Sequence, residues 1–118
     1  MALVVDPRGN WEIKQRRPGG RPEDDVAVRI SVVRSGLAKG AGTFDGSALW
    51  DGRRGELGGE VKGATIRFTI KWPDGLVGEY RGYWFADGYL RGHSQSATNP
   101  ASTAEWWSAE NRFRQVDL

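Results

Sequence analysis

The sequence contains no cysteine, which excludes a disulfide framework and any chemistry that depends on a thiolate. Its one histidine, His93, has no partner at a metal-binding spacing and no nearby serine or cysteine in a recognisable nucleophile elbow, so neither a metal site nor a catalytic site is indicated. No apolar run approaches the roughly 20 residues that a membrane-spanning helix needs. The first residues do not resemble a signal peptide, and we expect a cytoplasmic protein or a secreted one whose leader has been removed.

Charge of either sign is not concentrated in any part of the chain. The 17 basic and 15 acidic residues give a net charge of +2 and are spread over both halves. Nucleic-acid-binding proteins usually carry a basic patch or stripe, and this sequence has none. None of its glycine-rich stretches leads from a strand into a helix, as a phosphate-binding loop would. We therefore expect no nucleic-acid partner, no membrane partner and no cofactor.

Glycine and tryptophan are abundant instead, with 17 glycines and six tryptophans among 118 residues. Short segments of alternating apolar and polar residues recur along the chain, separated by glycine, Asp-Gly and proline turns. They predict strands at 9–16, 25–35, 40–50, 60–72, 76–86, 88–97 and 102–117, the last broken near Ala109, with turns at 51–59. Seven or eight antiparallel strands must close or stack to hide their edges. Residues 1–118 are therefore predicted to form one all-β domain, a closed antiparallel up-and-down barrel of about eight strands.

Two turns near the centre of the chain allow the strand register to be predicted. Pro73-Asp74-Gly75 fits a three-residue loop, which places Phe68 opposite Tyr80. Asp87-Gly88 fits a two-residue hairpin, which places Tyr80 opposite Gln95. Side chains alternate between the two faces of a strand. The inner face is therefore predicted to hold Ile66, Phe68, Ile70, Trp72, Leu76, Tyr80, Trp84, Arg91, His93 and Gln95.

This predicted inner face begins as an apolar core and ends in polar side chains, which must bond one another, water or a ligand. We interpret it as a ligand pocket at the barrel mouth. Its apolar walls would be Phe44, Trp72, Tyr80, Trp84 and Trp107. Its orienting groups would be Arg91, His93, Gln95 and Asn111. Two outcomes stay open for Arg91: it pairs with Glu105 in a sealed structural cluster, or it meets an anionic or carbonyl-bearing ligand at an open mouth.

The outer face is predicted to carry an apolar band formed by Val77, Tyr83, Phe85 and Leu90. Adjacent residues of a strand point to opposite faces, so one residue of the pair Trp106-Trp107 also points outward. An apolar band of this kind indicates a subunit contact. We therefore expect a homo-oligomer.

The order of short motifs resembles the avidin–streptavidin group of calycin-like β-barrels. That group opens with a Gly-x-Trp strand and has a Gly-Thr-aromatic strand, which match Gly9-Asn10-Trp11 and Gly42-Thr43-Phe44. Its central strands match Phe68-Thr69-Ile70-Lys71-Trp72 and Tyr80-Arg81-Gly82-Tyr83-Trp84. Its late motif of a tryptophan followed by acidic-x-Phe is matched by Trp106 or Trp107 and Asn111-Arg112-Phe113. The resemblance spans nearly the whole chain and implies a barrel with a pocket at its mouth.

The polar residues with which that family binds the ureido ring of biotin are largely replaced here. The positions that would supply side-chain hydrogen bonds hold Ile13, Arg17, Gly46, Leu76 and Gly78. A later pocket tryptophan corresponds to Gln95, and the late aspartate corresponds to Asn111. A site built for hydrogen bonds loses orders of magnitude in affinity when they vanish. We therefore expect a small-ligand-binding barrel that does not bind biotin tightly.

Three other functions remain open at this point. A lectin-like module would stack sugar on Trp50, Trp106 or Trp107, so the partner would be a glycan instead of another small molecule. A small biosynthetic cyclase would shape a reactive polyene by proximity alone and would need no catalytic signature. The barrel could also be purely structural. Enzyme activity is thus uncertain, and the sequence argues for binding over catalysis.

Overall fold

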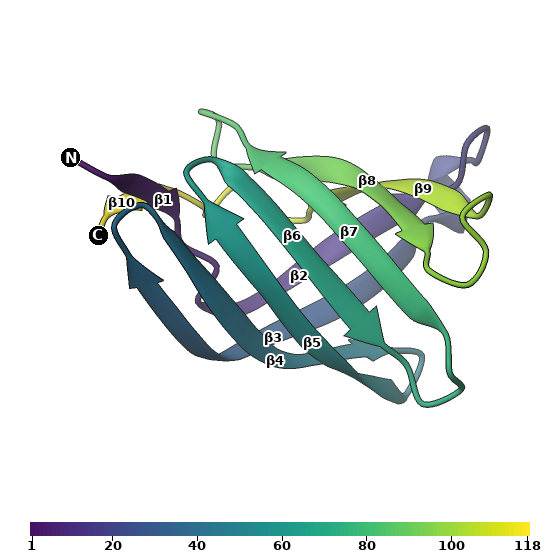
Figure 1. The fold of residues 1–118 in the computed structure, drawn as a ribbon. Helices are drawn as coiled ribbons and strands as arrows, with labels where there is room; N and C mark the ends of the chain where they lie inside the picture. Colours follow the sequence, from purple (N-terminus) through teal and green to yellow (C-terminus); the bar gives the residue numbers. More distant parts are fainter.

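Buried and exposed residues alternate along nearly every strand of the computed structural model, which describes all 118 residues. The predicted fold is confirmed, since eight antiparallel strands form a closed barrel (Figure 1). Each strand pairs with the next along the chain, and the last pairs with the first. The barrel strands are β2 (Gly9–Arg16), β3 (Val26–Ala38), β4 (Ala41–Trp50), β5 (Arg53–Lys62), β6 (Thr65–Lys71), β7 (Val77–Trp84), β8 (Leu90–Ser96) and β9 (Thr103–Ser108). A short 3₁₀ turn, η1 (Pro22–Asp24), lies between β2 and β3. The structure contains no helix that could span a membrane.

Strand β5 is the main element that the sequence reading missed, because residues 51–59 were predicted to be turns. In this strand the inward positions alternate between Gly55, Leu57, Gly59 and Val61. Glycine is required at Gly59, since a Cβ there would lie 2.6 Å from Phe44 Cζ. The aromatic core thus forces glycine into the strand and hides its apolar pattern. The predicted break near Ala109 in the strand at 102–117 is confirmed, since β9 ends at Ser108 and the chain resumes as β10 (Gln115–Asp117).

The barrel interior is filled by aromatic rings around Trp106, whose side chain is 1% exposed. The Trp106 indole N–H donates to the backbone oxygens of Arg81 and His93 at 3.2 and 3.1 Å. Phe68 and Tyr80 stack with ring centroids 4.7 Å apart, and Trp106 meets Phe68 edge-on at 5.4 Å. A buried indole needs both apolar contact and an acceptor for its N–H. This core accounts for part of the high tryptophan content.

The predicted register is confirmed for one hairpin and wrong for the next. Phe68 pairs with Tyr80 as expected. At the second hairpin, the Phe85 N–H donates to the Tyr89 oxygen at 3.0 Å, so three residues form the loop where two were predicted. Every partner in β8 is therefore shifted by one residue, and Tyr80 pairs with Ser94. This shift turns the inward set of β8 into Leu90, Gly92, Ser94 and Ser96.

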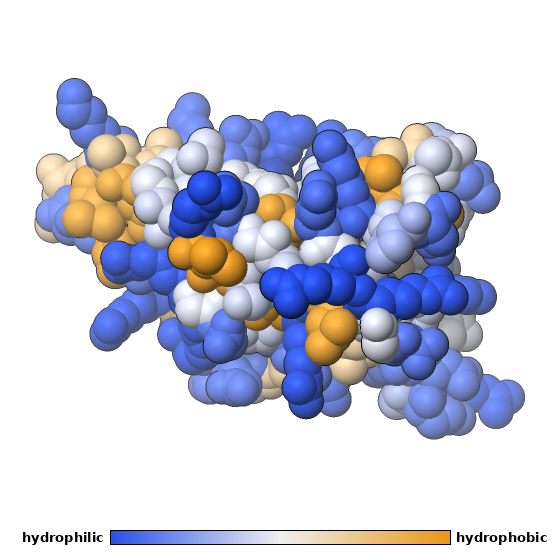
Figure 2. Space-filling view, turned by 90° about the horizontal axis from the view of Figure 1, so that it is seen from below, coloured by the Kyte–Doolittle hydropathy of each residue, from blue (hydrophilic) through white to orange (hydrophobic).

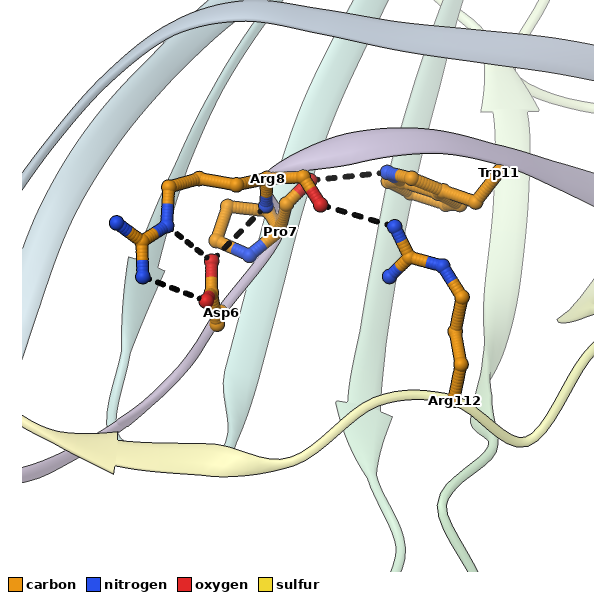
Figure 3. Close-up of polar contacts among 5 residues, drawn as sticks. All are labelled: Asp6, Pro7, Arg8, Trp11 and Arg112. Carbon is orange, nitrogen blue, oxygen red and sulfur yellow. Dashed lines mark hydrogen bonds and ion pairs between the residues drawn. The ribbon is translucent and has the colours of Figure 1, made fainter.

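The chain termini close one end of the barrel (Figure 1). Strand β1 (Leu3–Val5) pairs with β10, and the Val5 N–H donates to the Gly63 oxygen at 2.8 Å. Figure 3 shows how the segment that enters β2 is held. Trp11 Nε1 donates to the Pro7 oxygen at 3.0 Å, and Arg112 Nη2 donates to the Arg8 oxygen at 2.9 Å. The opposite end, where the β6–β7 turn and the β8–β9 loop lie, is not covered by the termini.

The face of the barrel seen in Figure 2 is mostly hydrophilic. Its apolar groups are separated from one another by hydrophilic ones, except where they gather at the end that carries the termini. This face offers no continuous apolar band along the barrel wall. A self-association surface of the predicted kind would therefore have to lie elsewhere on the wall.

Candidate ligand-binding site at the open end

A mouth cavity of about 750 Å³ opens between the loops at the end opposite the termini. It is lined by the inward residues of several strands and by the loop at 17–25. Two other hollows, of about 290 and 620 Å³, lie on the outer wall of the barrel. The mouth cavity is the largest of the three and the one that reaches the interior. Small-molecule sites are typically concave, partly apolar and of this size.

The wall of the mouth cavity is formed by Trp50 and Trp72, at the ends of two strands. Their rings meet edge-on with centroids 6.2 Å apart. Gly55 makes room for them, because a Cβ at that position would lie 3.0 Å from Trp72 Cε3. The guanidinium of Arg53 lies 5.5 Å from the centroid of the Trp50 ring and pairs with Asp74 at 3.0 Å. The tryptophans are thus fixed by packing and by a neighbouring cation.

The floor of the cavity combines a buried phenol with a buried amide. Tyr80 is 4% exposed, and burial raises its pKa to about 12, an effect opposed in part by the neighbouring Gln15 amide. The Tyr80 hydroxyl is therefore neutral at physiological pH. Gln15 Oε1 is buried and has no hydrogen-bond partner. Ser94 lies opposite Tyr80 in the register and also lines the cavity. The floor thus offers polar groups that a small molecule could bond.

The rim carries several arginines, most of which have carboxylate partners. Arg16 donates from Nε and Nη2 to the carboxylate of Asp25 at 2.7 and 2.9 Å, and this contact holds the pKa of Asp25 below its ordinary value. Arg21 lies 3.9 Å from Glu23. Arg17 also lines the cavity. Because these charges are largely balanced, the rim itself selects weakly for ligand charge.

Three of the nine predicted site residues line the mouth cavity: Trp72, Tyr80 and Gln95. Phe44 lies deeper, 3% exposed in the core. Trp84 lies toward the closed end, where its Nε1 donates to the Phe113 oxygen at 2.9 Å. Gln95 was predicted to point inward, but it pairs with Glu79 on the outer face of the barrel. It contributes to the cavity only at the rim.

The prediction that Arg91 and His93 point into the barrel is wrong. Arg91 is on the outer wall, where it pairs with Asp87 at 2.8 Å. Its guanidinium carbon lies 4.9 Å from the ring centroid of Phe85 and 5.0 Å from that of Tyr89. His93 is exposed on the same wall. Glu105 pairs with His93 in the register and is exposed, so neither predicted environment for Arg91 exists. The cause is the one-residue shift after the second hairpin.

The remaining predicted residues also lie outside the cavity. Trp107 is on the outer wall, with the Arg16 guanidinium 5.3 Å from its ring centroid. Asn111 is exposed in the segment after β9, near the closed end. In the predicted outer band, Tyr83 and Phe85 are 59% and 43% exposed as expected. Leu90 was wrongly placed there, since it is fully buried for the same register reason.

Sequence reasoning missed Gln15, Ser94 and the role of Trp50 in the mouth wall. The signal for Gln15 was present, because it continues the inward alternation of Trp11 and Ile13. Ser94 could be found only with the correct register. No three histidine, aspartate or glutamate side chains come together in a way that could hold a metal ion.

No protein-family model matches this sequence, and no curated protein matches it. Among solved structures, a redesigned β-barrel has a TM-score of 0.58 at 11% identity, covering 87% of this chain and 90% of that barrel. The redesigned barrel mFAP1, bound to DFHBI, has a TM-score of 0.58 at 9% identity, covering 87% and 94%. EF1p2_mFAP2b, bound to DFHBI, has a TM-score of 0.51 at 9% identity, covering 94% and 93%. At these identities the likeness supports the closed eight-stranded barrel fold, and it is not specific for the avidin or calycin group.

Proposed function

We propose that this protein binds a small, partly aromatic molecule non-covalently in the mouth cavity. The observation that carries the proposal is Gln15 Oε1, a buried acceptor without a partner at the floor of a cavity walled by Trp50 and Trp72. An unpaired buried polar group costs about 1–3 kcal/mol. A ligand with an N–H or O–H donor at its inner end would remove that cost, and its ring would pack against the tryptophans.

The structural neighbours support this proposal by analogy only. Two of them are designed barrels that bind the small dye DFHBI, so this barrel architecture can hold a small molecule. A fold alone does not define a function. The likeness to avidin in motif order implies a pocket at a barrel mouth, but it carries no residue set for biotin.

The mouth cavity is favoured over the alternative of a sugar-stacking tryptophan. Trp107, the outward member of the adjacent pair, is half-buried and already has the Arg16 guanidinium 5.3 Å from its ring. Trp50 contributes to the mouth wall, and Trp106 is buried. A cyclase would use the same cavity, so a bound polyene that is recovered unchanged would favour the binding function over the cyclase.

The direct test uses 7-amino-4-methylcoumarin, a planar probe with an N–H donor at one end. We expect saturable binding, followed by coumarin emission, and about tenfold weaker binding of the 7-dimethylamino analogue, because that analogue cannot donate to Gln15. Ser94→Trp should abolish binding by filling the cavity. His93→Trp is the matched control, since it adds the same side chain one residue away on the outer wall. Failure of both coumarins and DFHBI to bind, or equal binding to both variants, would contradict the proposal.

A further inference from the structure

A second hollow, separate from the mouth cavity, lies on the outer wall over the centre of β5. It has a volume of about 290 Å³, just below the usual range for small-molecule sites. Gly58, on the outward side of β5, forms its floor. Six polar side chains from the neighbouring strands β4, β5, β6 and β7 surround it: Thr43, Glu60, Arg67, Thr69, Glu79 and Arg81. The backbone around the hollow is therefore part of the rigid barrel wall.

Gly58 has no steric reason to be glycine. A Cβ at this position would meet no atom within 4 Å, and the backbone is not in the left-handed region. The next residue, Gly59, differs, because a Cβ there would lie 2.6 Å from Phe44 Cζ. Glycine inside a strand weakens it, and often marks a place where a ligand or another backbone approaches closely. The consequence of glycine at this position is an open hollow.

The side chains around the hollow include one favourable cross-strand pair, since Glu60 is directly opposite Arg67 in the register. The one ion pair among them joins Arg67 Nη1 and Glu60 Oε1 at 3.8 Å, whereas Arg34 and Asp45 nearby on the same wall approach to 3.0 Å. Arg67 is directly opposite Arg81 in the register. Like charges directly opposite each other on neighbouring strands are destabilising. Stability of the sheet therefore explains the Glu60–Arg67 pair, and it does not explain the placement of Arg81 opposite Arg67.

The charges around the hollow cancel, since two arginines are balanced by two glutamates. An ion of either sign would meet repulsion from two of the four, whereas a neutral molecule would not. Glutamates accept hydrogen bonds, arginines donate them and threonine hydroxyls do both. A neutral ligand rich in hydroxyl groups can satisfy all of them. We propose that this hollow binds one hexopyranose unit through its ring hydroxyls. This site is independent of the function proposed for the mouth.

The test is an amide chemical-shift titration of the full ¹⁵N-labelled chain with three methyl glycosides: the α-mannoside, the α-glucoside and the β-galactoside. At least one should cause saturable shifts at Gly58 and Thr69 in the millimolar range. Gly58→Val should fold, because its Cβ has open space, and should abolish these shifts. Gly36→Val is the matched control, since Gly36 is also in a strand, also has open space at Cβ and does not line the hollow. It should retain them.

Three outcomes would overturn the inference. The first is no localised shift with any of the glycosides at 100-fold molar excess. The second is shifts that persist in Gly58→Val. The third is a localised response to inorganic phosphate alone, which would mean that the hollow recognises an anion. Arg81→Gln should reduce the affinity for the responding glycoside at least fivefold, and an unchanged affinity would likewise count against the site.

Discussion

Replacing Gln15 by leucine should stabilise the protein while weakening its ligand binding. In the structure, Gln15 Oε1 is a buried acceptor without a partner, a state that costs about 1–3 kcal/mol. Leucine removes that acceptor, and it also loses the contact between the amide and Tyr80, worth about 0.5–1.5 kcal/mol. The net expectation is a gain of about 1 kcal/mol, or about 4 °C in Tm for a chain of this size.

Urea unfolding followed by tryptophan emission measures this change directly. Gln95→Leu, an exposed glutamine on the cavity rim, is the matched control and should change stability by less than about 0.5 kcal/mol. The affinity of Gln15→Leu for 7-amino-4-methylcoumarin should fall about tenfold. Sites that keep unsatisfied polar groups for function commonly trade stability for binding. A loss of 1 kcal/mol or more in Gln15→Leu would refute the reasoning, because it would mean that Oε1 is bonded in solution.

Four other predictions follow from the core, the ion pairs, the pocket and the outer wall. Trp106→Leu should destabilise by about 3 kcal/mol in urea unfolding, since it empties core volume and removes a buried N–H donor; a loss below 1 kcal/mol would contradict the packing. The pKa of Asp25 is lowered by Arg16, so stability should be constant from about pH 8 to pH 5 and fall below about pH 4 as the carboxylate is protonated. Arg16→Met should flatten that fall, and an unchanged pH profile would count against the pair. Calorimetry should detect no nanomolar biotin binding, and a nanomolar Kd would revive the avidin-like function. Sedimentation should show a homo-oligomer that Tyr83→Glu weakens, since Tyr83 and Phe85 are exposed; a monomeric parent at micromolar concentration would contradict it.

Much of the barrel was predictable from local pattern. Strand β2 was expected at its observed bounds, because its alternation is regular and proline and glycine flank it. Strand β5 was not expected, because Gly55 and Gly59 replace the apolar residues that would have shown a two-residue period. Those glycines are explained by atoms of neighbouring strands that approach closely, among them the Arg67 oxygen and Phe44 at Gly59, and Ile70 and Trp72 at Gly55. A contact of that kind is set by the closed barrel, and sequence alone does not report it.

The site was harder to predict, because it depends on one loop. Asp87-Gly88 satisfies a two-residue turn, and Gly88, with a φ of +91°, equally serves as the last residue of a three-residue loop. Burial decides between them. The shorter loop would put Arg91 and His93 inside the barrel, where an unpaired charge costs several kcal/mol. The longer loop buries Leu90 instead and places Gly82 beside Gly92, leaving room for the Trp106 ring.

The alternation within β8 already carried this information. Its residues from Leu90 to Ser96 separate into an uncharged set at even positions and a polar or charged set at odd positions. The predicted register points the odd-numbered residues of β8 inward. It fits a two-residue turn, but it contradicts the alternation of uncharged and charged residues along the whole strand. A turn constrains two or three residues, whereas burial acts on every second residue of a strand, and a one-residue slip reverses all of them. For a small barrel, the burial pattern of a strand should therefore be given more weight than the turn when the two disagree. For this chain, that choice moves the candidate ligand site from Arg91 and His93 to Gln15 and Ser94.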